Sequence, residues 1–146
     1  MRTIAFLICV GIFAFGCGDV HTIARAADEE VSATASRLRV RTMGEFKVIF
    51  GYLTVQGRTR TLLTADLECF ALQVGSSKSD SIWVDSFVDI QRGDYPAQNG
   101  KVAVAVYWAM KDFKDATEQE LRNATLSIVH PFLGPCFQFE APEKRK

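Results

Sequence analysis

The chain has 146 residues, of which 48% are hydrophobic and 23% are charged, and it contains 11 Phe residues. That composition supplies enough apolar surface for a core and excludes a globally disordered chain. The 17 Lys and Arg residues balance 17 Asp and Glu residues, so no strongly basic surface predicts binding to nucleic acid. The length is typical of one domain and not of a multidomain enzyme.

The first segment, residues 1–26, is typical of a secretory signal peptide. Arg2 precedes an apolar run from Ile4 to Gly16, which is shorter than the roughly 20 residues of a membrane-spanning helix. Ala24-Arg25-Ala26 then has the small-x-small pattern that a signal peptidase recognises. We therefore predict cleavage before Ala27 and a secreted or periplasmic protein.

Two alternatives remain for the end of this segment. Gly16 places a small residue directly before Cys17, as bacterial lipoprotein processing requires. Acyl chains on Cys17 would then anchor the protein at a membrane surface. Cleavage near Gly18 is the second alternative. In both cases the chain would still be exported.

The remaining chain is predicted to consist of a flexible leader, one domain and a charged tail. The leader covers 27–37, where the residues are small and polar after an acidic start. The domain covers 38–140, where most runs alternate apolar and polar residues with the period of two that is typical of β-strands. The tail covers 141–146 and ends in four charged residues, Glu143-Lys144-Arg145-Lys146.

The predicted strands, in chain order, are 45–55, 59–74, 81–90, 101–110, 123–130 and 136–139. Gly51 inside the first strand indicates a bulge, and Gly57 lies in the joint of a predicted hairpin between the first two strands. The second strand changes phase at Cys69, which indicates a kink there. The run 101–110 is apolar on both faces, as is typical of a central strand.

The one helical candidate lies within 112–122, where Thr117 and Glu120 have the spacing of a capping box. This pattern predicts an all-β domain, a single antiparallel β-sandwich or small barrel of six to seven strands with at most one short helix.

The cysteines predict a disulfide bond. Removal of residues 1–26 leaves only Cys69 and Cys136, and an even pair in an exported protein indicates a disulfide. In the chain-entropy model, such a long closed loop contributes about 4 kcal/mol to stability. These cysteines and His130 lack the spacing of a zinc site, so we predict no metal and no other cofactor.

Catalytic motifs are sparse. The sequence has no glycine-rich phosphate loop, no HExxH motif and no Gly-x-Ser-x-Gly elbow. Acidic side chains are the remaining candidates for a small hydrolase, either Asp66 with Glu68 or the group around Asp85. Such residues more often lie on solvated faces of strands, so an enzyme is the less favoured interpretation.

The strongest candidate for function is one face of the strand 81–90, which carries Trp83, Asp85, Phe87 and Asp89. Exposed aromatics beside carboxylates suit contact with a protein or a carbohydrate. The favoured interpretation of these two aromatics, however, is that Trp83 and Phe87 pack into a second layer of the core. We therefore expect an exported, non-catalytic binding module, with a small secreted hydrolase or a membrane-anchored lipoprotein as alternatives.

Overall fold

The structure is a computed structural model that describes residues 19–26, 29–85, 94–110, 116–128 and 136–141. The described residues form ten strands: β1 (Val20–Ala26), β2 (Glu29–Met43), β3 (Phe46–Gly57), β4 (Leu62–Asp66), β5 (Phe70–Val74), β6 (Ser77–Val84), β7 (Asp94–Pro96), β8 (Lys101–Met110), β9 (Thr125–Ile128) and β10 (Phe137–Phe139). A short 3-10 turn, η1 (Leu67–Cys69), and one helix, α2 (Glu118–Arg122), complete these elements.

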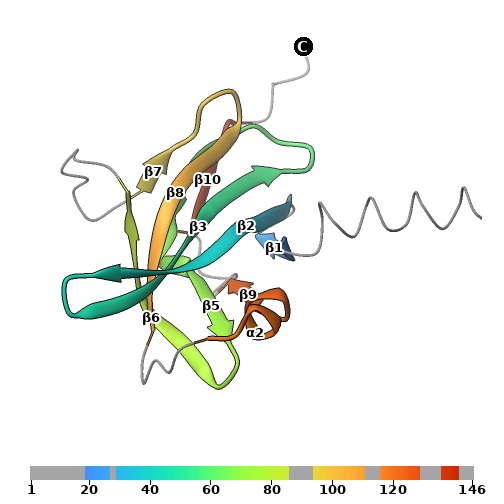
Figure 1. Ribbon diagram of the computed structural model, residues 1–146. Helices are drawn as coiled ribbons and strands as arrows, with labels where there is room; N and C mark the ends of the chain where they lie inside the picture. The colour runs from blue at the N-terminus through green and yellow to red at the C-terminus, as the bar shows by residue number, and fades with distance from the viewer. Residues whose placement is uncertain (1–18, 27–28, 86–93, 111–115, 129–135, 142–146) are drawn as a thin grey trace, which may run out of the picture.

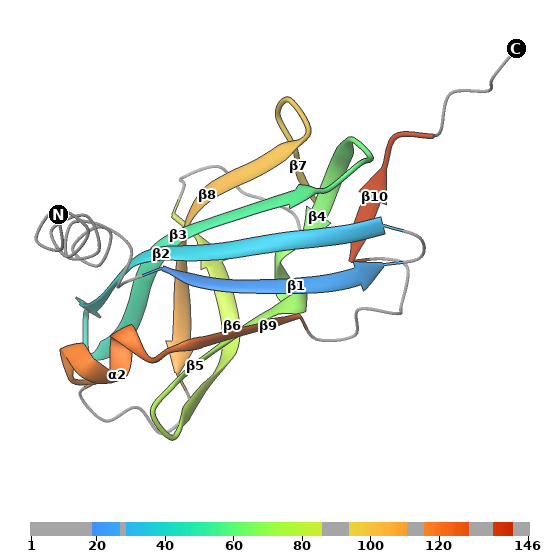
Figure 2. The same ribbon diagram turned by 90° about the vertical axis from the view of Figure 1, so that its right-hand side faces the viewer.

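Seven strands form a curved antiparallel sheet in the order β1-β2-β3-β8-β6-β5-β9 (Figure 1). Its two edge strands, β1 and β9, contact each other, so the sheet is nearly closed like a barrel (Figure 2). A second sheet has the order β10-β4-β7. The predicted all-β antiparallel class is confirmed. The additional strands are β1, β2 and the short strand β7, and the predicted run 59–74 is divided into β4 and β5.

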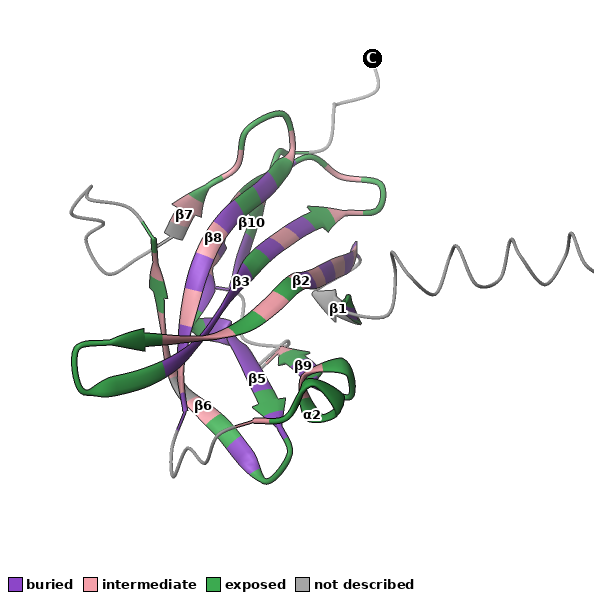
Figure 3. Ribbon diagram, viewed as in Figure 1, coloured by how far each residue is buried: buried purple, intermediate pink, exposed green. Residues whose placement is uncertain are grey.

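The strand β8 is central, as its sequence predicts, because it lies between β3 and β6. Its buried residues alternate with more exposed ones along the strand (Figure 3), and they are Val102, Val104, Val106, Trp108 and Met110. The predicted capping box is also confirmed, because Thr117 and Glu120 each accept a hydrogen bond from the other's backbone amide. The helix has only five residues.

The predicted flexible leader is wrong for residues 29–37, which belong to β2. Val31, Ala33 and Ala35 are at most 1% exposed and alternate with partly exposed residues. Two of these three core residues are alanines, which are only weakly hydrophobic. The alternation of apolar and polar residues was therefore hard to recognise in the sequence. The ordered domain therefore begins well before residue 38. Of the predicted tail, only Ala141 lies within the described residues.

The predicted hairpin between β3 and β4 is also wrong. Both edges of β3 are already paired, one with β2 and the other with β8, and β4 belongs to the smaller sheet. The connection after Gly57 is held by the buried carboxylate of Glu29. Thr59 donates to it from its amide and its hydroxyl, each at 2.6 Å, and the Arg60 amide donates at 3.2 Å.

Gly51 predicted a β-bulge in β3, but the structure has the bulge in the neighbouring strand β2, opposite Gly51. Ser36 pairs with Tyr52 and Arg39 pairs with Phe50, so two residues of β2 oppose Gly51 alone. A Cβ atom on Gly51 would lie 2.7 Å from Cδ2 of Leu38 and 3.0 Å from the carbonyl oxygen of Ser36. Glycine therefore allows the bulged strand to approach closely.

The bulge reverses which residues of β2 face the core. Before it, Ala33 and Ala35 face inward; after it, Leu38 and Val40 pack against the core. Arg37 adopts the left-handed φ of 52° at the bulge. The later odd-numbered residues consequently point outward, which places three arginines on the outer face of the sheet.

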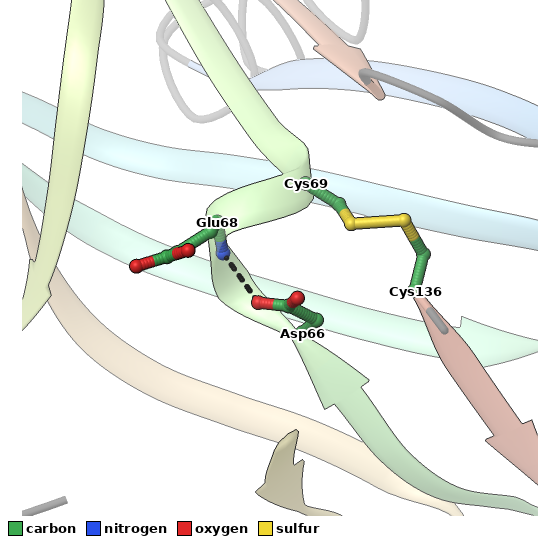
Figure 4. The surroundings of a disulfide bond; sticks show 4 residues. All are labelled: Asp66, Glu68, Cys69 and Cys136. Carbon is green, nitrogen blue, oxygen red and sulfur yellow. Dashed lines mark hydrogen bonds between the residues drawn. A yellow bond between two sulfur atoms is a disulfide. The ribbon is translucent and has the colours of Figure 1, made fainter. Parts of the chain in front are cut away.

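The predicted disulfide between Cys69 and Cys136 is confirmed, with an S–S distance of 2.05 Å and a Cα–Cα distance of 6.0 Å (Figure 4). Cys69 ends the 3-10 turn between β4 and β5, at the predicted kink, and Cys136 immediately precedes β10. The bond therefore ties the smaller sheet to the start of β5 in the larger one. A disulfide is compatible with an oxidising compartment. Across the described ranges, no helix is long and apolar enough to cross a membrane.

Candidate functional site

A row of side chains crosses four neighbouring strands on the outside of the larger sheet. Trp83 of β6 pairs with Tyr107 of β8, Tyr107 pairs with Phe50 of β3, and Phe50 pairs with Arg39 of β2. Residues directly opposite each other in antiparallel strands project from the same face. Since Trp108 and Ile49, their neighbours in sequence, lie in the core, this row lies on the outer face.

Two arginines cover the centre of the row. The guanidinium carbon of Arg39 lies 4.8 Å from the Phe50 ring centroid, and that of Arg41 lies 3.9 Å from it. Phe50 is consequently only 2% exposed, although it points away from the core. Cation–π contacts of this kind contribute about 0.5–1 kcal/mol each at exposed sites.

A third arginine extends the cluster along β2. The guanidinium of Arg37 lies 5.8 Å from the centroid of Tyr52, and the Tyr52 ring meets Phe50 edge-on at 5.5 Å. We name this surface the arginine–aromatic face. Its members are Arg37, Arg39, Arg41, Phe50, Tyr52, Trp83 and Tyr107. The same face continues to the tip of the β2–β3 hairpin, where Met43 is 44% and Phe46 is 75% exposed.

Trp83 and Asp85, two of the four predicted site residues, lie at this surface. Trp83 is 52% exposed, so the favoured interpretation, in which it packs into a second core layer, is wrong. Asp85 is also exposed, and its carboxylate hydrogen-bonds with Tyr107. Phe87 and Asp89 lie outside the described residues.

Tyr107 links the acidic and basic parts of the face. Burial and the hydrogen bond to the Asp85 carboxylate raise the pKa of the Tyr107 hydroxyl, and nearby Arg41 opposes that shift. Nη1 of Arg41 donates to the Tyr107 oxygen at 3.2 Å, which leaves the phenol proton for Asp85. The neutral phenol therefore hydrogen-bonds with both Arg41 and Asp85, and it neutralises the charge of neither residue.

The three arginines of the face have no ion-pair partner among the residues that the structure describes. The surface ion pairs there use other arginines, namely Arg58 with Glu30 at 3.3 Å and Arg122 with Glu118 at 3.7 Å. The contacts of Arg37, Arg39 and Arg41 are with aromatic rings and the Tyr107 hydroxyl. The described charged residues at this surface, three arginines and Asp85, therefore carry a net positive charge on a protein whose formal charge is zero.

These arginines were missed in the sequence-based prediction of the site. The signal was present, because Arg37, Arg39 and Arg41 alternate as they do on one face of a strand. The predicted leader hid this pattern, because its end at residue 37 separated Arg37 from the other two arginines. Only the strand order shows that these arginines share a face with Trp83.

Of the acidic pair Asp66 and Glu68, the Asp66 side chain has a structural role at the 3-10 turn. Oδ1 of Asp66 caps this turn by accepting a hydrogen bond from the Glu68 amide at 3.0 Å (Figure 4). Within the described ranges, no group of three or more His, Cys, Asp or Glu residues could hold a metal ion.

A shallow, open pocket of about 540 Å³ lies beside α2, and its lining consists of Gln73, Gly75, Thr117, Gln119, Glu120, Asn123 and Thr125. One carboxylate, that of Glu120, is among these residues, and it accepts a hydrogen bond from the Thr117 amide at 2.9 Å. The pocket therefore presents mainly uncharged polar groups and offers less chemistry than the arginine–aromatic face.

No protein-family model, curated protein or solved structure matches this chain.

Proposed function

We propose that this chain is an exported, non-catalytic binding module that contacts an acidic partner protein through the arginine–aromatic face. The observation that carries the proposal is the 52% exposure of Trp83 on the same face as three arginines that have no carboxylate partner among the described residues. Trp, Tyr and Arg are the residue types most enriched at the energetic centres of protein interfaces.

The chemistry of the partner follows from the charge of the face. Three guanidinium groups on a formally neutral protein favour a partner whose surface carries carboxylates, because complementary potentials steer association and set specificity. The face is the outside of a curved sheet, whereas small ligands are usually held in concave pockets. This shape favours a protein over a carbohydrate as the partner.

Export is supported by two independent features. The positively charged start and short apolar run before residue 17 are typical of a secretory signal. The disulfide between Cys69 and Cys136 is of the kind that persists in oxidising compartments. We therefore place the protein in the periplasm or outside the cell, with attachment through an acylated Cys17 as the alternative.

The experiment is a pull-down in which the exported protein is the bait for components of its own cell envelope. Trp83→Ala is compared with Leu63→Ala, since Leu63 is 46% exposed but lies on β4 of the smaller sheet. We expect a partner that is retained by the wild type and by Leu63→Ala, lost with Trp83→Ala and released by salt. Equal retention by both variants would contradict the proposal. A hydrolytic activity that Asp66→Asn abolishes would support the hydrolase alternative instead.

A further inference from the structure

The strand β1 lies within the segment predicted to be removed on export. All of its residues are in register with β2, from Val20 opposite Ala35 to Ala26 opposite Glu29. On its other edge, β2 pairs with β3. Cleavage before Ala27 would therefore turn an interior strand of the sheet into an edge strand with unpaired amides and carbonyls.

Removal of β1 would also open the core. Val20 is 7% exposed and belongs to the core cluster, together with Val31, Ala33 and Ala35 of β2. The side chains of the two strands are linked on the outer face as well, because Nδ1 of His21 lies 2.9 Å from Oγ1 of Thr34. β1 also contacts β9 across the seam of the barrel (Figure 2), so it lies between β2 and β9 where the sheet closes.

We infer that the exported chain is processed upstream of β1, between Gly16 and Val20, and not before Ala27. Two bonds in this interval follow a small residue, those after Gly16 and after Gly18. Hydrolysis of either bond consumes one water and leaves the whole of β1 on the mature chain. This inference rests on the proposed export but is independent of the proposed binding face.

The first test identifies the N-terminus of the protein that cells export from the full-length gene. Intact mass and N-terminal sequencing should show a chain that begins at Cys17, with or without acyl chains, or at Asp19. A chain that begins at Ala27 would overturn the inference. A chain that is exported but still carries residues 1–16 would also overturn it.

The second test asks whether β1 stabilises the exported protein. Val20→Ala removes a buried side chain, and Ile23→Ala is the matched control because Ile23 is 66% exposed on the same strand. The Tm of Val20→Ala should fall by about 5 °C, and that of Ile23→Ala should stay within about 1 °C of the wild type. Only variants with the wild-type N-terminus are compared. Unchanged Tm values for both variants would overturn the inference, because they would show that β1 is not part of the folded product.

Discussion

The guanidinium carbon of Arg41 lies 3.9 Å from the centroid of the Phe50 ring, on the outside of the sheet. Together with Arg39, it hides an aromatic ring that would otherwise be exposed on the surface. Among the residues that the structure describes, these arginines are held in place by aromatic contacts and not by carboxylates. Their charges remain available to a partner, and this arrangement is the basis of the proposed function.

Arg41→Ala should destabilise the domain because it uncovers Phe50 and removes the hydrogen bond to Tyr107. We expect a loss of about 1 kcal/mol in the free energy of unfolding, measured by urea denaturation. Arg58→Ala is the control, since Arg58 lies in an exposed ion pair with Glu30, and such pairs contribute little. Equal losses for the two variants would contradict the covering role of Arg41.

Gly51→Ala should destabilise the domain by about 1–3 kcal/mol, because the new methyl group would collide with Leu38 and with the Ser36 carbonyl at the bulge. A double-mutant cycle with Leu38→Ala separates the two collisions. The combined loss should be smaller than the sum of the single losses, since the shorter of the two contacts is relieved. Additive losses would show that Leu38 does not limit the space at Gly51.

The bulge also shows how much of this fold the sequence alone could predict. Regular alternation was enough to predict β8, because Val102 to Met110 repeat a strong apolar signal, and an even cysteine count was enough for the disulfide. The alternation failed where small residues form the core face, as at Ala33 and Ala35. Gly51 indicated a bulge, but periodicity could not show that the extra residue lies in the neighbouring strand.

The candidate site, like the fold, was predictable from the sequence only in part. Trp83 was predicted from its own strand, because an aromatic beside Asp85 is visible in the local pattern. The arginines of the same face come from β2, which is separated from β6 by β3 and β8. Pairing across β3 and β8 brings them to one face, and no pattern within a single segment contains that information.

Glu29 should make the stability of the domain depend on acidic pH. Burial acts to raise the pKa of this carboxyl, but the hydrogen bonds from Thr59 and the neighbouring amides outweigh burial and lower the pKa from 4.5. A group whose pKa is lowered on folding contributes stability above its unfolded pKa and loses it as the pH falls through the folded pKa. The wild type should therefore lose stability below about pH 4.5.

Glu29→Gln tests this assignment by urea denaturation at several pH values. The variant should be less stable than the wild type at pH 7, and the difference should shrink as the pH falls below 4.5. Glu118→Gln is the matched control, since the Glu118 side chain is 91% exposed. If the difference in unfolding free energy between wild type and Glu29→Gln stays constant across the acidic range, the ionised carboxylate of Glu29 is not the form that stabilises the fold.

The disulfide should contribute about 4 kcal/mol to the free energy of unfolding, because it closes a loop between residues that are 67 positions apart. The double variant Cys69→Ala/Cys136→Ala should lower the urea midpoint, and added reductant should then have no further effect on this variant. In the wild type, reductant should lower the midpoint by a similar amount. A wild-type midpoint that reductant does not change would contradict the stabilising role of the bond.

The most direct test of the proposed function measures the binding of labelled poly-L-glutamate, as a stand-in for an acidic partner, by fluorescence anisotropy. Arg39→Glu/Arg41→Glu is compared with Arg58→Glu/Arg122→Glu, which makes the same change in net charge at arginines outside the face. Circular dichroism first confirms that both variants are folded. We expect salt-sensitive binding by the wild type, weakening of about tenfold or more in the first variant, and a change of no more than about twofold in the second. Equal weakening in both variants, or no binding by the wild type at low salt, would contradict an acidic partner at the arginine–aromatic face.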